Sequence, residues 1–589
     1  MKKIISLGKF PITCWLVSLG PIIILLSFII RFSVNVPLWD EWALVDTFNQ
    51  VYAGEITLKN LAAQHNEHRI LFPRLIFILL AFPFKWNIIY EQYFSVFLTF
   101  IAWLAIAILA LKQTNHRNKT GVYLANFLSS ILLFSVVQSD SWLFGFQLIW
   151  LLINTCVAIA VFLFGASRMT ILSFLMAALT CFIASFSAAH GLVAWIAILP
   201  CIVYSVRKLR PRIIITALWG VCFAVSAALY FIGYHKPPSH PNTLYFFEHP
   251  WIATRYFFTL LGGFSIRSLP GSTIAGLILF VIFCYYAFRF TSCYQRAKFA
   301  APWLSIGLFP ILFALIATIG RSGFGVEQAM TSRYTTNSVF LVVAIVQLFR
   351  LSLYSTARDR TNLGIWPQRA FQFFVFTIIG IVIVNSVQVV PEWQFWYKHK
   401  AHTKTCLELI HYMDESHFED EPLNSCLRLV FPSTQLLQTW VASLEKMRFR
   451  DFPQDLVFVD QPSVKQGEIE SPDPNVSSSL VPNEEGKVQI SGWAKVPNDS
   501  NPVKLILLSA NDRKQFFASA PISKDSPNLD DETSDTNGSN YREKRWSADI
   551  VIESLPPDVV KIGAWMYNPA EKQFVRLSGD LVVIAVEGS

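Results

Sequence analysis

The chain contains a succession of apolar runs long enough to cross a lipid bilayer, and these runs constrain its fold more than any other feature. The first, 12–32, has about the 20 residues that a spanning helix needs and follows three lysines. No small-x-small cleavage site follows it, so we expect a retained helix rather than a signal peptide. Further runs of spanning or near-spanning length cover 88–111, 122–138, 143–164, 170–187, 190–205, 213–234, 272–290, 302–320, 337–354 and 371–390.

Composition agrees with this reading, because 53% of the residues are hydrophobic and only 15% are charged. A water-soluble fold is therefore excluded, and we expect an integral, multi-pass protein of a plasma or inner membrane. The formal net charge of +8 comes mostly from short loops between apolar runs. Membrane topology explains such loop charges, so no nucleic-acid partner is expected.

The shorter run Ile70–Phe84 decides the topology, because Pro73 and Arg74 interrupt it. If it does not cross, most Lys and Arg residues fall in inside loops, as the positive-inside rule requires. If it crosses, the Lys-rich and Arg-rich loops lie outside instead, which violates the rule at nearly every loop. We therefore expect an interfacial or re-entrant helix on the outer face. The fold class is then mainly α, with about eleven transmembrane helices, a cytoplasmic N-terminus and an outer first loop at 34–87 that carries interfacial helices.

The residues after the last apolar run have the composition of a soluble chain, which this topology places outside the cytoplasm. We expect a transmembrane domain at 1–390, an extracytoplasmic helical segment at 391–460, a Pro/Ser/Glu-rich linker at 461–484 and a small all-β sandwich at 485–589. Segments such as KVQISGWAKV and VKLILLSA indicate the sandwich, since they are short and rich in β-branched residues. Cys406 and Cys426 share this oxidising side, and both a disulfide and two unpaired thiols remain open.

Ionisable and polar residues gather on the predicted outer side of the membrane domain. Residues of this kind near a bilayer usually face a cavity and serve a function. A carboxylate can take a proton from an acceptor hydroxyl, and arginines can stabilise a departing phosphate. The candidates are Asp40, Glu41, His65, Glu67, His68, Arg69, Arg74, Asp140, His190, Arg321, Glu327, Arg333 and Tyr334.

Each candidate also has a purely structural interpretation. Asp40 and Glu41 suit the N-terminus of a surface helix that begins near Trp42. The run HNEHR fits an interfacial polar patch in which Arg69 extends to water. Asp140 suits a turn and helix cap, and a histidine such as His190 often packs inside a core. Arg321 and Arg333 suit interfacial anchors.

Four short stretches, WDEW, QHNEHR, SDSW and SRY, together with this layout, carry a family resemblance. An acidic motif directly after the first span, a long first outer loop, many further spans and an outer soluble domain resemble the GT-C superfamily of polytopic glycosyltransferases. The resemblance covers residues 1–390 in layout and is sharpest at WDEW. It implies transfer of a sugar from a polyprenyl-phosphate donor to a glycan, lipid or protein acceptor at the outer face, usually with inversion.

The resemblance also implies roles for individual residues. Asp40 corresponds to the catalytic base, with Glu41 as its nearest substitute. Asp140 and Glu67 match a second acid that assists, or that holds Mg²⁺ or Mn²⁺ together with Asp40. Arg321 and Arg333 are candidates for the donor phosphate. The histidines of QHNEHR depart from the family pattern, and their role is open.

Two other functions compete with this interpretation. A transporter or flippase of a lipid-linked saccharide also needs a polar cavity with basic residues, but it commonly has inverted repeats and interrupted helices that this sequence does not show. A non-catalytic membrane scaffold with an outer β-domain needs no convergent acids at all. Loss of activity on mutating the outer acids distinguishes an enzyme from a scaffold.

Overall fold

The structure is a computed structural model that describes most of the chain. The described residues are 12–113, 119–166, 169–238, 241–242, 244–358, 366–414, 425–470, 487–497, 505–522, 533–534, 540–551 and 561–582. They form two compact units. Residues 1–33, 54–80 and 88–394 belong to the first, called here the helical unit, and residues 34–53, 81–87 and 395–589 belong to the second, called the mixed unit.

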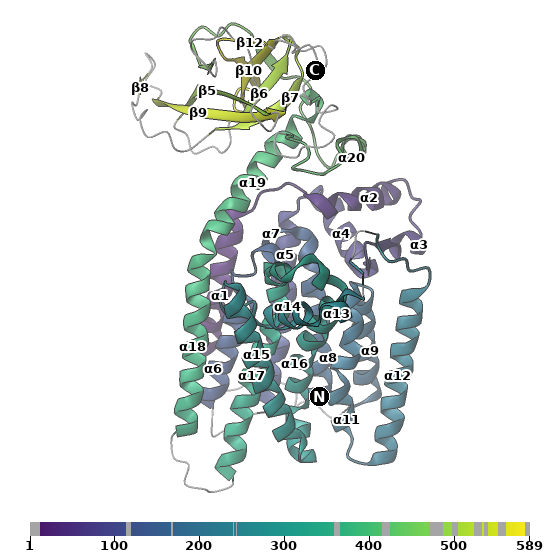
Figure 1. Cartoon of the computed structure of the whole chain (residues 1–589). Coiled ribbons are helices and arrows are strands. Elements are labelled where there is room, and N and C mark those ends of the chain that lie inside the picture. The colour runs from purple at the N-terminus through teal and green to yellow at the C-terminus, as the bar shows by residue number, and fades with distance from the viewer. Residues whose placement is uncertain are drawn as a thin grey trace. The chain divides into compact units, whose positions relative to one another are not determined.

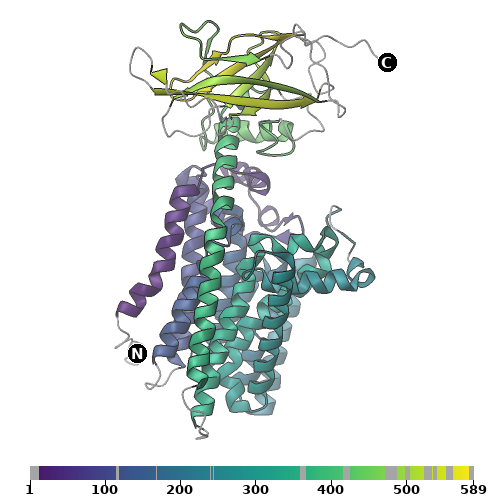
Figure 2. The same cartoon turned by 60° about the vertical axis from the view of Figure 1, so that its left-hand side comes forward.

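Eight helical segments in the described part of the chain are long and apolar enough to span a membrane. They are built from α1 (Ile12–Phe32), α5 (Ile89–Lys112), α8 (Leu148–Gly165), α12 (Leu209–Phe231), α15 (Leu269–Thr291), α16 (Tyr294–Arg321), α17 (Ser332–Arg358) and α18 (Trp366–Gln388), the last continuing into α19 (Val390–Glu408). Long helices run side by side in one bundle (Figure 1, Figure 2). A helix satisfies its own backbone hydrogen bonds, which the interior of a bilayer requires.

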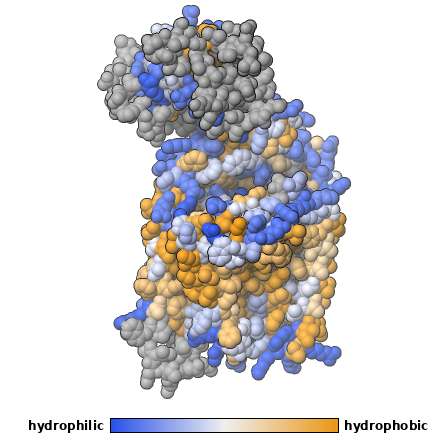
Figure 3. Space-filling view, viewed as in Figure 1, coloured by the Kyte–Doolittle hydropathy of each residue, from blue (hydrophilic) through white to orange (hydrophobic). Residues whose placement is uncertain are grey.

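The outer faces of these helices are apolar. Large hydrophobic side chains are exposed on them, among them Ile213 and Val221 of α12, Ile278 of α15 and Phe376 of α18. Figure 3 shows a band of hydrophobic residues across the visible face of the bundle, with hydrophilic residues gathered toward its ends. Such a band matches a bilayer and not water. The chain is thus an integral membrane protein, as the sequence predicts.

Three of the expected spans are present as shorter apolar helices. Residues 122–138, 170–187 and 190–205 correspond to α6 (Lys119–Leu133), α9 (Ile171–Ser185), and α10 (Ala194–Ala197) with α11 (Leu199–Ser205). The run Ile70–Phe84 forms α4 (Leu71–Phe84), a helix of 14 residues. The total of about eleven spans and the interfacial location of α4 therefore stay predictions. The remaining helices here are α3 (Leu58–Leu61), α7 (Ser139–Leu143), α13 (Tyr245–Glu248) and α14 (Pro250–Gly262).

Two glycines allow α14 and α15 to approach closely. A Cβ atom on Gly276 would lie 1.8 Å from the backbone oxygen of Phe258, and one on Gly262 would lie 1.9 Å from that of Ser272. No other residue leaves room for this backbone contact. Nearby, the amide of Asn385 donates to the backbone oxygens of Phe264 and Ser265 at 2.9 and 2.6 Å, which satisfies carbonyls at the end of α14.

The mixed unit joins the segment after the first span to a distant part of the chain. This segment forms a 3-10 helix (Trp39–Ala43) and α2 (Leu44–Tyr52), and the later part supplies α20 (Thr434–Lys446). Trp42 stacks on Trp440 with ring centroids 6.2 Å apart, and Asp46 accepts a hydrogen bond of 2.8 Å from the Trp440 indole. The two cysteines left open by the sequence form a Cys406–Cys426 disulfide.

The C-terminal part of the mixed unit is β-rich, as predicted. One sheet has the order β3 (Val457–Val459), β11 (Gln573–Arg576), β10 (Lys561–Asn568), β6 (Leu505–Ala510) and β7 (Phe516–Pro521), with β12 (Leu581–Val582) on β10. The other has β4 (Gly467–Glu470), β5 (Lys487–Pro497), β9 (Asn540–Val551) and β8 (Thr533–Ser534). One core holds side chains from both sheets, including Ile490, Trp546, Ile506 and Ile562, so the sheets pack as a sandwich.

The sandwich begins earlier in the sequence than residue 485. Strand β4 lies inside the range expected as a linker and pairs with β5, and β3 lies inside the range expected as helical. Strand β3 has only three residues and β4 has one apolar residue in four, so neither shows a clear alternating pattern, which explains the misplaced boundary. Residues 471–486 of the expected linker lie outside the described residues.

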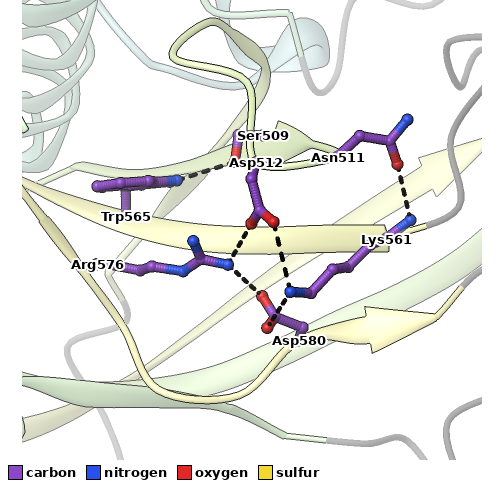
Figure 4. A network of polar contacts seen from close by, with 7 residues as sticks. All are labelled: Ser509, Asn511, Asp512, Lys561, Trp565, Arg576 and Asp580. Carbon is purple, nitrogen blue, oxygen red and sulfur yellow. Dashed lines mark hydrogen bonds and ion pairs between the residues drawn. The ribbon is translucent and has the colours of Figure 1, made fainter. Parts of the chain in front are cut away.

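An ion network closes one end of the sandwich (Figure 4). Arg576 contacts Asp512 at 2.5 Å and Asp580 at 2.9 Å, and Lys561 contacts Asp580 at 2.9 Å. The three elements joined are the turn after β6, the start of β10 and the turn between β11 and β12. Because these groups are partly exposed, the network contributes little stability per pair and serves mainly to fix the turns.

Candidate functional site

A small hairpin presents the charged cluster QHNEHR to the helical unit. Strands β1 (Gln64–His65) and β2 (His68–Arg69) pair antiparallel, with His65 opposite His68. Asn66, in the two-residue turn, has a φ of 49°, a left-handed conformation that asparagine adopts more readily than most residues. The turn therefore projects Glu67 and His68 away from the strands' other neighbours.

Arg69 and Gln64 anchor this hairpin to the end of α12. Arg69 donates to the backbone oxygens of Tyr230 at 2.5 Å and Ala62 at 2.8 Å, and also to that of Ile232. Gln64 donates to the backbone oxygen of His235 at 2.5 Å and accepts from its N–H at 3.1 Å. These contacts give Arg69 a structural function, and its guanidinium does not line the cavity described next. Its predicted role in substrate binding stays a prediction.

A cavity of about 310 Å³ lies between the hairpin and the helices. Six elements or segments surround it: the hairpin, α8, the 3-10 helix Ala189–Val193, the stretch after α12, α16 and α17. Its lining is Glu67, His68, Trp150, Ala189, His190, Tyr234, Lys236, Phe313, Ile316, Ala317, Gly320, Arg321 and Tyr334. Five of the predicted site residues, Glu67, His68, His190, Arg321 and Tyr334, thus meet around one space.

An ion pair forms the polar wall of this cavity. Arg321, the last residue of α16, donates to Oε1 of Glu67. His68 accepts a hydrogen bond of 3.3 Å from the N–H of Ala189 at its Nδ1, which leaves its protonated Nε2 directed at Oε1 of Glu67, 3.6 Å away. Burial acts to raise the pKa of Glu67, but the charges of His68 and Arg321 outweigh it and lower that pKa to about 2. Glu67 is therefore ionised at any physiological pH.

Aromatic rings form a second part of the lining, called here the aromatic wall. The His190 imidazole stacks on Trp150, with ring centroids 4.3 Å apart and planes at 27°. Phe313 contacts both of these rings edge-on, and Tyr334 closes the group at 5.7 Å from Trp150. The cavity is therefore amphipathic, because both charged groups and aromatic rings line it. Lys236, at the rim, donates to the backbone oxygen of Pro241 at 2.8 Å.

A second polar cluster joins the motifs SDSW and SRY. The backbone N–H of Asp140 donates to Oγ of Ser332 at 3.0 Å, and the hydroxyls of Ser139 and Ser332 are 3.1 Å apart. Burial raises the pKa of Asp140, although the neighbouring charge of Arg333 opposes the rise. Arg333 itself lies over the ring of Tyr334 at 5.6 Å. Asp140 does not line the cavity.

The acidic pair of WDEW belongs to the mixed unit, and its two carboxylates differ. Glu41 is buried, and its carboxylate accepts a hydrogen bond of 2.7 Å from the N–H of Leu38. Glu41 therefore caps the 3-10 helix, which is the structural role considered from the sequence. The Asp40 side chain is exposed. Because Asp40 and the cavity lie in different units, a pocket shared between them stays a prediction.

His65 takes a different position from its neighbours. Its ring packs against Phe146 at 5.1 Å, and it does not line the cavity. Conversely, sequence reasoning missed Trp150, Phe313, Tyr234 and Lys236. Trp150 and Phe313 lie within apolar runs, where the sequence does not distinguish an aromatic residue that faces a cavity from one that faces lipid. Lys236 carried a usable signal, since it is one of the few basic residues in the predicted outer loops.

The residues described do not form a ready site for Mg²⁺ or Mn²⁺. Among them, His402, Cys406 and Cys426 are the one group of three or more potential ligands close enough together to share an ion. Those sulfurs form the disulfide, whereas Mg²⁺ and Mn²⁺ prefer oxygen ligands. In the cavity the Glu67 carboxylate already faces Arg321. The expected cation stays a prediction, and no reaction step is assigned to it.

Comparisons with known proteins give one structural similarity. No protein-family model matches the sequence, and no curated protein does. A crystal structure of ArnT from Cupriavidus metallidurans, bound to undecaprenyl phosphate, matches with a TM-score of 0.35 and 12% sequence identity. The alignment covers 76% of this chain and 83% of ArnT. The TM-score and the sequence identity are both low, so the chemistry is inferred from the residues of the site itself.

Proposed function

We propose that this chain is a membrane glycosyltransferase that moves a sugar from a polyprenyl-phosphate donor to an acceptor on the extracytoplasmic face. The observation that supports it best is the cavity of about 310 Å³ at the ends of apolar helices, with a partly buried ion pair in its lining. A lipid-linked donor carries both an apolar chain and a charged phosphate. A bundle that exposes apolar faces to lipid and encloses cations suits both parts.

Arg321 is the proposed phosphate ligand. A guanidinium has five N–H donors, and the bond to Glu67 fixes its plane while others stay available. Lys236 adds a second positive charge at the rim. As the glycosyl bond breaks, negative charge grows on the phosphate, and cations held in place beforehand stabilise that charge.

Glu67 is a poor general base. A base works best when its pKa lies near the working pH, whereas the pKa of Glu67 is about 2. Its role is to orient Arg321. Asp40, with an exposed carboxylate directly after the first span, keeps the role of base that the family resemblance implies. Asp140, whose pKa is raised by burial, is the second candidate proton acceptor.

In the proposed reaction, the base removes a proton from an acceptor hydroxyl as its oxygen attacks the anomeric carbon. A new glycosidic bond forms, the bond from that carbon to the phosphate oxygen breaks, and polyprenyl phosphate leaves as an anion next to Arg321. Attack opposite to the leaving group inverts the anomeric centre. The charge distribution of the loops supports a cytoplasmic N-terminus and an extracytoplasmic mixed unit.

The test measures transfer of radiolabelled sugar from undecaprenyl phosphate to an added lipid or glycan acceptor by the purified protein in detergent. The Asp40→Asn variant should lose turnover by a factor of at least about 100 while keeping its expression and elution volume. Glu55→Gln removes an exposed acid from the same outer loop and should leave turnover unchanged. Full activity of Asp40→Asn removes Asp40 from the base role. Absence of any turnover by the unaltered protein, with lipid still bound, favours a carrier over an enzyme.

A further inference from the structure

His190 gives the aromatic wall a polar edge, in addition to the Trp150 indole and the Tyr334 hydroxyl. Its side chain is 3% exposed, and its Nε2 has no hydrogen-bond partner among the described residues. Stacking on Trp150 and an edge contact with Phe313 hold the ring in one orientation. A buried polar atom without a hydrogen-bond partner is rare and costs stability. An unpaired Nε2 beside a cavity therefore points to a ligand that supplies the missing hydrogen bond.

The surroundings restrict the chemistry of that ligand group. Burial between Trp150 and Phe313 removes the water that would stabilise a charged imidazole, which favours the neutral ring. A neutral, desolvated nitrogen cannot compensate a full charge on its partner, so an ammonium or a carboxylate group placed there would be penalised. An uncharged hydroxyl, which both donates and accepts, satisfies Nε2 in either tautomer. The phosphate fits better next to the positive charge of Arg321.

We infer that His190 recognises an uncharged hydroxyl group of the transferred sugar, and so selects a neutral sugar at this position. This inference rests on the proposed function, because it assigns the aromatic wall to the sugar and the ion-pair wall to the phosphate. The ring carbons of a sugar present apolar C–H groups to Trp150, Phe313 and Tyr334, while one hydroxyl meets Nε2. His190 is then a specificity residue: discrimination arises because a sugar lacking that hydroxyl leaves Nε2 unpaired.

The experiment measures equilibrium binding of three kinds of lipid to the full-length protein in lipid nanodiscs. The first probe is undecaprenyl phosphate alone. The second is a set of undecaprenyl-phosphate-linked neutral sugars, namely glucose, mannose and arabinose. The third is undecaprenyl-phosphate-linked glucosamine, which carries a charge. The variants are His190→Phe, which keeps the stacked ring without nitrogen, His190→Gln, which keeps a hydrogen-bonding amide, and His249→Gln as a control at an exposed histidine.

The unaltered protein should bind at least one neutral sugar lipid roughly tenfold or more tightly than bare undecaprenyl phosphate, as one good hydrogen bond allows. His190→Phe should abolish this preference without changing the affinity for bare lipid. His190→Gln should keep part of it, and His249→Gln all of it. If His190→Phe does not fold, as judged by elution volume, His190→Gln decides.

Three results would overturn the inference and leave the proposed function intact. One is equal affinity of the unaltered protein for bare lipid and every neutral sugar lipid. Another is an equal loss of both affinities in His190→Phe, which would assign His190 to the phosphate. The last is a preference for glucosamine that depends on His190. Failure to bind any undecaprenyl lipid is a different outcome, because it would overturn the proposed function itself.

Discussion

Glu67 keeps its charge in a partly buried site because the Arg321 guanidinium and the His68 imidazole face it. Its side chain is only 15% exposed, and burial alone would favour the protonated acid. Arg321 and His68 reverse that preference, and the hydrogen bond from Arg321 adds to it. Such pairs contribute little net stability, but removing one partner leaves the other charge buried and uncompensated. The pair is therefore better understood as a means of fixing Arg321 than as a source of stability.

This arrangement predicts a pH-dependent effect of Glu67→Gln on stability. The variant should lower the free energy of unfolding by about 1–3 kcal/mol at neutral pH, since Arg321 loses a charged partner. The folded-state pKa of about 2 lies below the ordinary 4.5, so the contribution of Glu67 is complete above about pH 4.5 and is lost as the pH falls toward 2.

Thermal unfolding in detergent from pH 7 to pH 3 measures this effect. The difference between the two proteins should be constant down to about pH 4.5 and then shrink. Glu327→Gln, at an exposed glutamate near Arg321, is the matched control and should show almost no difference. A difference that instead grows toward acid would contradict the pairing.

At the residue level, the sequence predicted which charged residues lie at the cavity better than it predicted the groups that they contact. Topology and residue type sufficed to select Glu67, His68, His190, Arg321 and Tyr334, which the structure gathers around one cavity. Their roles toward a substrate stay predictions. The same reasoning could not identify Arg69 as a structural residue that binds backbone oxygens. An arginine in a polar cluster has the same sequence pattern whether it binds the backbone or a substrate.

At the level of elements, the contact between α14 and α15 depends on two small residues. Gly262 and Gly276 occupy the positions where the helix backbones come closest. Close approach increases van der Waals contact, which is the main force between helices in lipid. Because α14 leads into the loop that precedes α15, this contact also limits how the outer segment can move.

Substituting these glycines should therefore have unequal effects. Gly276→Ala places a methyl group within 1.8 Å of a backbone oxygen, so the helices must separate, at a cost of about 1–3 kcal/mol. Gly220→Ala, in α12, meets no atom within 4 Å and should be neutral or stabilising by up to about 1 kcal/mol. Thermal unfolding of both variants in detergent measures the contrast, and equal melting temperatures would argue against the close contact.

The sequence located the long helices and longer strands such as β5 and β6 well, and the short strands β3 and β4 poorly. The expected run 88–111 corresponds to α5 at Ile89–Lys112, because hydropathy alone defines a spanning helix. Strand β4, with the sequence GEIE, has one apolar residue in four, and only its pairing with β5 identifies it. Pairing depends on residues distant in the chain, which local patterns do not encode.

For the whole molecule, the main surprise is that the segment predicted as the first outer loop is divided between two units. Residues 34–53 fold with residues after 394, and Trp42 and Asp46 contact the same tryptophan, Trp440. Composition suggested one continuous membrane domain from 1 to 390. The acidic motif WDEW is thus held by a soluble part of the chain, so the stability of the mixed unit should influence the position of Asp40.

Membrane orientation is the property of the whole molecule on which the proposed reaction depends. Single cysteines at Lys208 and Glu571, both exposed, sample the loop before α12 and the β-sandwich. They are introduced after Cys284 and Cys293, the exposed native thiols among the described residues, are changed to serine. In spheroplasts a membrane-impermeant maleimide should label Glu571→Cys at once, but Lys208→Cys only after permeabilisation, because basic loops resist translocation. Labelling of Lys208→Cys in sealed spheroplasts would reverse the topology. The β-sandwich and Asp40 would then lie in the cytoplasm, and a reaction on the extracytoplasmic face would have no base.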